Sequence, residues 1–146
     1  MRLSKGWTLA AFCMVCLIWG NSMVSGTGSG SLSLSIVQLV HGALGALGLP
    51  YEWVTNFLVR KCAHFSEYLL LGVLVCHAFD VECRWRFPGL LIIAGALAAV
   101  PCIDETIQLF VPGRCGAVRD VCIDCAGAAT GTFLCWLLGH KPVTFR

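Results

Sequence analysis

The chain has 146 residues, of which 58% are hydrophobic and 12% charged, with a formal net charge of +2 and a mean hydropathy of +0.81. Soluble domains carry about 25% charged residues, so this composition indicates a membrane protein rather than a soluble domain. The small net charge, without a basic stripe interleaved with aromatic residues, argues against nucleic acid as a partner.

Four long apolar runs predict a single-domain, all-α membrane protein. They cover residues 7–24, 63–79, 87–103 and 118–139. A helix of roughly 17–25 residues crosses a hydrocarbon layer about 30 Å thick. Four such helices make one small bundle, so we expect a four-helix transmembrane bundle formed by residues 1–146.

The region around the first span contains a loop and an additional helix. Arg2 and Lys5 precede residues 7–24 as in a signal peptide, but no small-x-small cleavage site follows, so we expect a retained helix. Residues 25–35 are rich in Ser and Gly and predict a loop. Residues 32–49 are too rich in Gly and Ser for a confident span and predict an interfacial helix between the first and second spans.

The second span begins with polar residues on one helix face. His64, Glu67 and Tyr68 are spaced i, i+3 and i+4, and Arg60 joins this face one turn earlier. A carboxylate facing lipid would be costly, so Glu67 is expected to point into the bundle. The structural alternative to a functional site is an ion pair between Glu67 and Arg60 or Arg114.

The most polar stretch of the chain lies between the third and fourth apolar runs. Asp104 and Gln108 lie one helical turn apart and predict a polar helix face. Pro112-Gly113 predicts a turn, which places Arg114 directly after it. Charges beside hydrocarbon are costly, so they usually bind something or hold elements together.

Small residues in the last two spans predict close helix contacts. Residues 94–99 are Ala, Gly and Leu, which would let a neighbouring helix approach. Gly127 and Gly131 form a G-x-x-x-G pattern, which predicts a contact inside the bundle or a face for homo-oligomers; the first is preferred. Asp120 and Asp124 lie one turn apart at the start of the same helix.

The distribution of Lys and Arg predicts the orientation. With four spans, the two termini and the middle loop share one side, which carries six basic residues against four on the other. The six are Arg2, Lys5, Arg84, Arg86, Lys141 and Arg146. We therefore expect a multi-pass protein of the cytoplasmic membrane, with both termini cytoplasmic and the polar stretches facing outward.

This topology brings the polar side chains to one membrane surface. The candidate ligand-binding residues are Arg60, Lys61, His64, Glu67, Tyr68, Asp104, Glu105, Gln108, Arg114, Asp120 and Asp124. The preferred interpretation is a site for an amphiphilic or lipid-linked envelope ligand, with membrane lipids as further partners. Arg60, Arg114 and Arg119 would hold its anionic headgroup, because the planar fork of Arg binds two phosphate oxygens.

Two other interpretations remain open. His64 and the carboxylates could bind a divalent metal, or act as acid and base in an enzyme acting on an envelope lipid. The catalytic candidates are His64, Glu67, Glu105 and Asp120. Alternatively, the charges form a buried ion-pair network that fixes the bundle without chemistry.

Two sequence blocks resemble a known family. They read Lys61-x-x-His64-Phe65-x-Glu67-Tyr68 and Asp104-Glu105-x-x-Gln108-x-Phe110-Val111-Pro112-Gly113-Arg114, followed by Asp120-Val121. In order and spacing they resemble the VanZ-like membrane proteins over most of the chain. The resemblance implies an envelope-associated protein that spans the membrane several times. The namesake is linked to teicoplanin resistance, so the resemblance also implies a lipoglycopeptide among the candidate ligands.

The chain departs from the family pattern at two places. It carries Asn21-Ser22-Met23 where members commonly have a Ser-Ser-Gln type segment after the first helix. It also carries Asp124 where the last block usually has Asn. The second change adds a carboxylate near Asp120 and favours a site that binds a cation or forms ion pairs.

Overall fold

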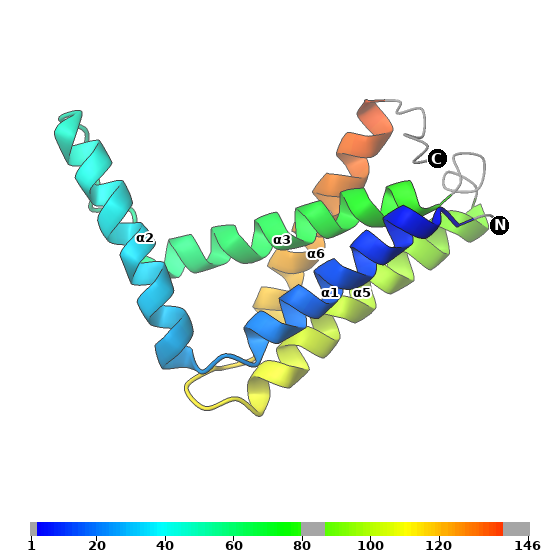
Figure 1. Cartoon of the computed structure of the whole chain (residues 1–146), viewed down its shortest axis with the longest axis horizontal. Helices are drawn as coiled ribbons and strands as arrows, with labels where there is room; N and C mark the ends of the chain where they lie inside the picture. Colours follow the sequence, from blue (N-terminus) through cyan, green and yellow to red (C-terminus); the bar gives the residue numbers. More distant parts are fainter. Residues whose placement is uncertain (1–2, 80–86, 139–146) are drawn as a thin grey trace.

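The structure is a computed structural model that describes residues 3–79 and 87–138. These residues form five α-helices and no β-strand (Figure 1). The helices are α1 (Lys5–Ser22), α2 (Gly26–Ala46), α3 (Asn56–Ala78), α5 (Phe87–Leu109) and α6 (Val118–Leu137). The all-α prediction is therefore confirmed. Of the six basic residues that predict the cytoplasmic side, only Lys5 lies within the described residues.

Two helices in the described part of the chain are long and apolar enough to cross a membrane. They are Gly89–Leu109 within α5 and Val118–Leu137, which is α6. α1 and α2 pass the same test only as a pair, and the chain bends by 105° between them. α3 has 23 residues but also carries Arg60, Lys61 and Glu67, which lower its hydropathy. The described residues therefore contain two or three candidate spans, so the predicted four spans are not confirmed.

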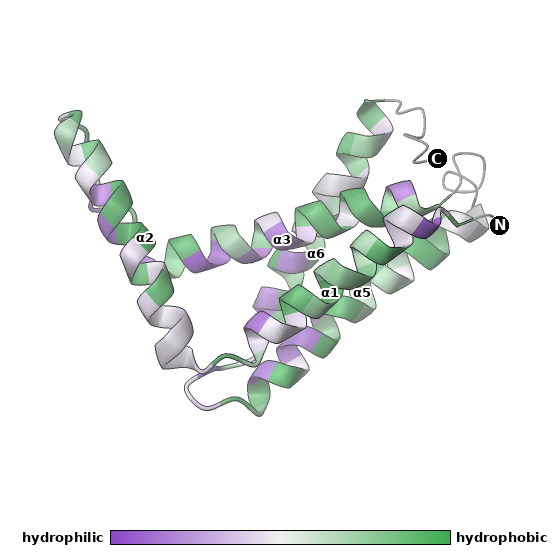
Figure 2. Cartoon of the chain, in the orientation of Figure 1, coloured by the Kyte–Doolittle hydropathy of each residue, from purple (hydrophilic) through white to green (hydrophobic). Residues whose placement is uncertain are grey.

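The helices alternate in direction. In Figure 1, α1 and α5 run side by side toward one end of the molecule, and α3 and α6 run back from it. α2 extends away from the other four helices. Figure 2 shows that the hydrophilic segments gather where α1 and α5 end and where α3 and α6 begin.

The loop predicted for residues 25–35 is wrong, because α2 begins at Gly26. Ser25 is its N-cap, and its hydroxyl oxygen accepts a hydrogen bond from the Gly28 N–H at 3.3 Å. Further hydroxyls donate to backbone carbonyls three or four residues earlier, and they belong to Ser31, Ser33 and Ser35. Serine is thus accommodated inside the helix by bonding to the helix itself.

The interfacial helix predicted for residues 32–49 forms the later part of α2, which ends at Ala46. Gly48 follows with a φ of 68°, a left-handed conformation that favours glycine and stops the helix. Its position at a membrane interface stays a prediction.

α3 and α5 extend beyond the predicted spans into the polar sequence. α3 begins at Asn56, with Thr55 as its N-cap. α5 continues to Leu109, so the polar face that starts at Asp104 is helical. The start of α3 and the end of α5 differ from the predicted span limits because hydropathy marks where a span meets polar sequence. Helix hydrogen bonds, in contrast, continue through polar residues.

Small residues let α6 lie directly against α3, and these two helices form the most extensive contact of the fold. A Cβ atom at Gly127 would overlap the carbonyl of Phe65, and one at Gly131 would overlap the carbonyl of Leu69. The G-x-x-x-G pattern therefore makes the intramolecular contact that was preferred.

The small residues of α5 do not make a similarly tight contact. Instead, Ala94 and Ala98 line an apolar groove of about 410 Å³ between α5 and α6. The buried core borders this groove and includes Ala11, Ile18, Tyr68, Leu71, Ile93, Leu97 and Ala128. Of these, Ile93, Leu97 and Ala128 also line the groove. Large apolar side chains are also exposed on the outer faces, among them Leu9, Phe12, Leu91, Phe133 and Trp136. Exposed apolar surface of this extent is typical of contact with lipid.

The contact between α3 and α6 predicts the effect of adding one methyl group. Gly131→Ala is expected to lower the free energy of unfolding by about 1–3 kcal/mol, because the new Cβ must displace the Leu69 carbonyl. Gly95→Ala is the matched control, because a Cβ there has no heavy atom within 4 Å. Circular dichroism during unfolding in SDS measures both. Equal stability of the two variants would contradict the contact.

Candidate functional site

Polar side chains from four helices converge at one end of the bundle. α1 contributes Ser22, α5 contributes Asp104 and Gln108, and α6 contributes Asp124, all of them buried. α3 adds His64 and further charged side chains at the edge of this cluster. The i, i+4 spacing of Asp104 and Gln108 puts both on the inner face of α5, as predicted.

The amide of Gln108 connects the buried acidic groups. Its Nε2 lies 3.2 Å from Ser22 Oγ and 3.3 Å from both Asp104 Oδ2 and Glu105 Oε1. A side-chain amide carries two N–H donors, so three acceptors share them. Gln108 thereby links α1 to the two carboxylates of α5.

Glu105 also stabilises the start of α6. Its Oε2 accepts a hydrogen bond from the backbone N–H of Ala117, the N-cap residue of α6, at 2.8 Å. A carboxylate is favourable at this position because the N-terminus of a helix carries partial positive charge. The turn before it contains Gly113 with a φ of 75°, as the Pro112-Gly113 pair predicted.

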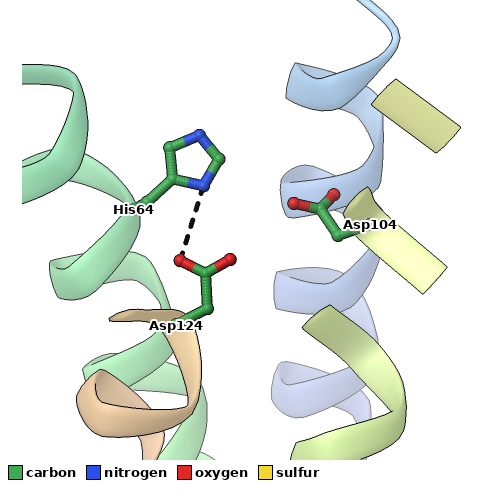
Figure 3. A group of neighbouring side chains, drawn as sticks. All are labelled: His64, Asp104 and Asp124. Carbon is green, nitrogen blue, oxygen red and sulfur yellow. Dashed lines mark ion pairs between the residues drawn. The ribbon is translucent and has the colours of Figure 1, made fainter. Parts of the chain in front are cut away.

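The carboxylates of α6 lie opposite cationic or ionisable side chains of α3. Lys61 Nζ is 2.5 Å from Asp120 Oδ2. His64 Nδ1 is 3.8 Å from Asp124 Oδ1, as Figure 3 shows. The one-turn spacing of the two aspartates on α6 matches the spacing of Lys61 and His64 on α3.

The predicted polar face of α3 contacts three different helices. His64 points to α6, whereas Glu67 Oε1 accepts a hydrogen bond from Asn21 Nδ2 of α1 at 2.9 Å. This contact takes the place of the ion pair with Arg60 or Arg114 that was considered as the structural alternative. The buried Tyr68 hydroxyl lies near Asp104 of α5 without a hydrogen bond of standard geometry.

Arg114 links the site to the bend between α1 and α2. Its Nε donates to the Val24 carbonyl at 2.9 Å, and its Nη2 donates to the Asn21 carbonyl at 2.6 Å. Burial, followed by the nearby Arg60 guanidinium, lowers the pKa of Arg114. An arginine remains charged despite such a shift, so two guanidinium groups of like charge lie near each other.

Two hollows adjoin these residues. A groove between α1, α2 and α3, called here the α2–α3 groove, has a volume of about 260 Å³. Its lining includes Val24, Leu32, Ile36, Arg60, His64 and Arg114. A polar cavity of about 40 Å³ lies beside it, and its lining includes Lys61, His64, Glu105, Gln108, Asp120 and Asp124. Arg60 and His64 line both hollows.

The structure gathers the predicted candidates and adds two that sequence reasoning did not include. The added residues are Asn21 and Ser22, which contact Glu67 and Gln108. Their segment had been noted only as a departure from the family pattern. Arg119, which was expected to help hold a headgroup, is exposed and does not line the α2–α3 groove.

The apolar helices and the polar cluster at one end of the bundle define a helical membrane protein. A model of the family VanZ/LLP1 matches residues 7–139. The chain belongs to this family, which confirms the resemblance inferred from the two sequence blocks. Comparisons with curated proteins and with solved structures give no match.

The position of Gln108 predicts its contribution to stability. Gln108→Ala is expected to lower the free energy of unfolding by about 1–3 kcal/mol, because buried carboxylates lose a donor. Thr106→Ala is the control, since Thr106 is exposed and donates only within α5, and its effect is expected within about 0.5 kcal/mol. Unfolding in SDS measures the free energy of unfolding of both variants. If Gln108→Ala left this free energy unchanged, the amide of Gln108 would not have the central role described.

Proposed function

We propose that this protein binds an anionic amphiphile, either a phospholipid or a lipid-linked envelope precursor, in the α2–α3 groove. One observation carries the proposal. Two guanidinium groups, those of Arg60 and Arg114, line a groove to which α2 contributes the apolar side chains of Leu32 and Ile36. Glu67 also lines this groove, so one carboxylate lies beside the two guanidinium groups. The excess of cationic charge, combined with an apolar side, matches the two parts of an anionic lipid.

The chemistry of the two arginines favours a phosphate group. A guanidinium presents five N–H donors, of which Arg114 uses Nε and one Nη2 donor for the carbonyls of Val24 and Asn21. Two like charges near each other repel, so an anion bound between them would relieve that repulsion. The volume of about 260 Å³ suits a headgroup and the adjoining part of a chain.

The proposal includes four membrane crossings by α1, α3, α5 and α6. Their alternating direction supports this topology (Figure 1). The 23 residues of α3 would be about 34 Å long at 1.5 Å per residue, enough to cross the hydrocarbon layer. The polar end would then lie at the outer surface, with both termini in the cytoplasm.

The same groove supplies a physical basis for a link to teicoplanin resistance, which we propose as the physiological setting. Teicoplanin-type drugs carry an acyl tail and are therefore amphiphiles. A protein that binds a lipid-linked envelope precursor or the drug itself at the outer leaflet could protect the cell. Both ligands would present polar and apolar parts to the α2–α3 groove.

The proposal predicts a charge-dependent loss of lipid binding. Arg60→Gln is expected to reduce retention of an anionic phospholipid by roughly tenfold, the effect of losing a charge-assisted hydrogen bond. Retention of a zwitterionic phospholipid should not change. Native mass spectrometry of the detergent-purified protein, after exchange with defined lipids, measures both.

Arg119→Gln is the matched control, because it removes the same charge from an exposed residue outside the groove. It should bind lipid like the original protein. If both variants lost anionic lipid equally, or if neither did, the α2–α3 groove would not be the binding site.

The proposed orientation predicts the accessibility of Cys115, which is exposed at the polar end of the bundle. In a variant that keeps only this cysteine, a membrane-impermeant maleimide is expected to label intact cells. A variant whose single cysteine replaces Lys5, at the opposite end of α1, should react only after lysis. The reverse pattern would overturn the orientation.

A further inference from the structure

We propose that His64, Asp104 and Asp124 bind one divalent transition-metal ion inside the bundle. Each residue offers a ligand atom, and these atoms lie within 4.8 Å of one another. Figure 3 shows the three side chains pointing toward a common space from α3, α5 and α6. This site shares His64 with the lining of the α2–α3 groove, whereas Asp104 and Asp124 do not line that groove.

Burial leaves carboxylate oxygens without partners at this point. Asp104 is 0% exposed and Asp124 is 1% exposed. Asp104 Oδ1 and Asp124 Oδ2 are buried and accept no hydrogen bond. Most buried polar atoms in proteins are hydrogen-bonded. The Tyr68 hydroxyl lies near Asp104 but makes no hydrogen bond of standard geometry, so the two aspartate oxygens are open to a further partner such as a cation.

Two of the three neighbouring cationic side chains are engaged elsewhere, and the third, Arg60, lines the polar cavity. Lys61 pairs with Asp120 at the edge of the cluster, and Arg114 donates to backbone carbonyls. A bound divalent ion would neutralise the two buried aspartates and so offset the cost of burying their charge.

The surroundings orient the ligand atoms. Gln108 donates to Asp104 Oδ2 and thereby leaves Oδ1 available for the ion. Hydrogen bonds of this kind hold ligating carboxylates in position in metal sites. The polar cavity of about 40 Å³, lined by His64 and Asp124, provides room beside the cluster for an ion and a water molecule.

The ligand set points to Zn²⁺ or Mn²⁺. One imidazole and two carboxylates suit these ions, whereas Ca²⁺ takes about 6–8 oxygen ligands. In a tetrahedral site with bond lengths of about 2.0–2.2 Å, ligand atoms lie roughly 3.3–3.6 Å apart, so a pair at the 4.8 Å limit needs to close by about 1.2–1.5 Å. Rotation of the aspartate side chains provides such a movement.

Metal binding is tested on the full-length protein in lipid-free detergent, so that the result is separate from lipid binding. After chelation and dialysis, Zn²⁺, Mn²⁺ and Mg²⁺ are each titrated by calorimetry, and retained metal is measured by mass spectrometry. We expect one equivalent of Zn²⁺ or Mn²⁺. Asp124→Asn and Asp104→Asn, which preserve volume, should weaken this binding by roughly tenfold or more.

Glu52→Gln is the matched control, because Glu52 is an exposed carboxylate that does not line the polar cavity. It should bind the ion like the original protein. His64→Gln gives a second variant if the aspartate variants fail to fold, because His64 is partly exposed and its loss removes the nitrogen ligand. Absence of a bound ion, or equal weakening in the Glu52 variant, would overturn the proposal.

Discussion

The close contact between α3 and α6 is the constraint on which the polar end of the bundle depends. Because Gly127 and Gly131 have no side chain, α6 lies directly on the backbone of α3. The first turns of α6 are then held where Asp120 reaches Lys61 and Asp124 reaches His64. A wider separation would leave these aspartates in a low-dielectric interior without counter-groups, at considerable cost.

The charges on the two sides of α3 are arranged differently. The carboxylates of Asp104, Glu105 and Asp124 occupy the interior between α3, α5 and α6. The guanidinium groups of Arg60 and Arg114 line the α2–α3 groove together with the carboxylate of Glu67. His64 adjoins both regions. An interior cation and a bound anion would therefore lie close together. Catalysis on an envelope lipid, the second interpretation from the sequence, would use the same histidine and stays a prediction.

Local spacing predicted most of the polar cluster, because i, i+4 pairs such as Asp104 with Gln108 require only that the helix forms. Contacts between distant segments were harder to predict. Asn21 and Ser22 carry no charge, so nothing in their own sequence marked them as partners of Glu67 and Gln108. The helix beginning at Gly26 was missed because Gly and Ser usually favour loops, and only the structure shows the serine hydroxyls bonding within the helix.

The most direct test of the account is photo-crosslinking to lipid at two positions of the purified protein in mixed vesicles. A photoreactive residue replacing Leu32 lies in the α2–α3 groove, and one replacing Ala98 lies in the apolar groove between α5 and α6. We expect the residue at position 32 to crosslink anionic phospholipid in excess of its mole fraction in the vesicle. The residue at position 98 should crosslink each lipid in proportion to its mole fraction. Capture in proportion at both positions would contradict a selective anionic site.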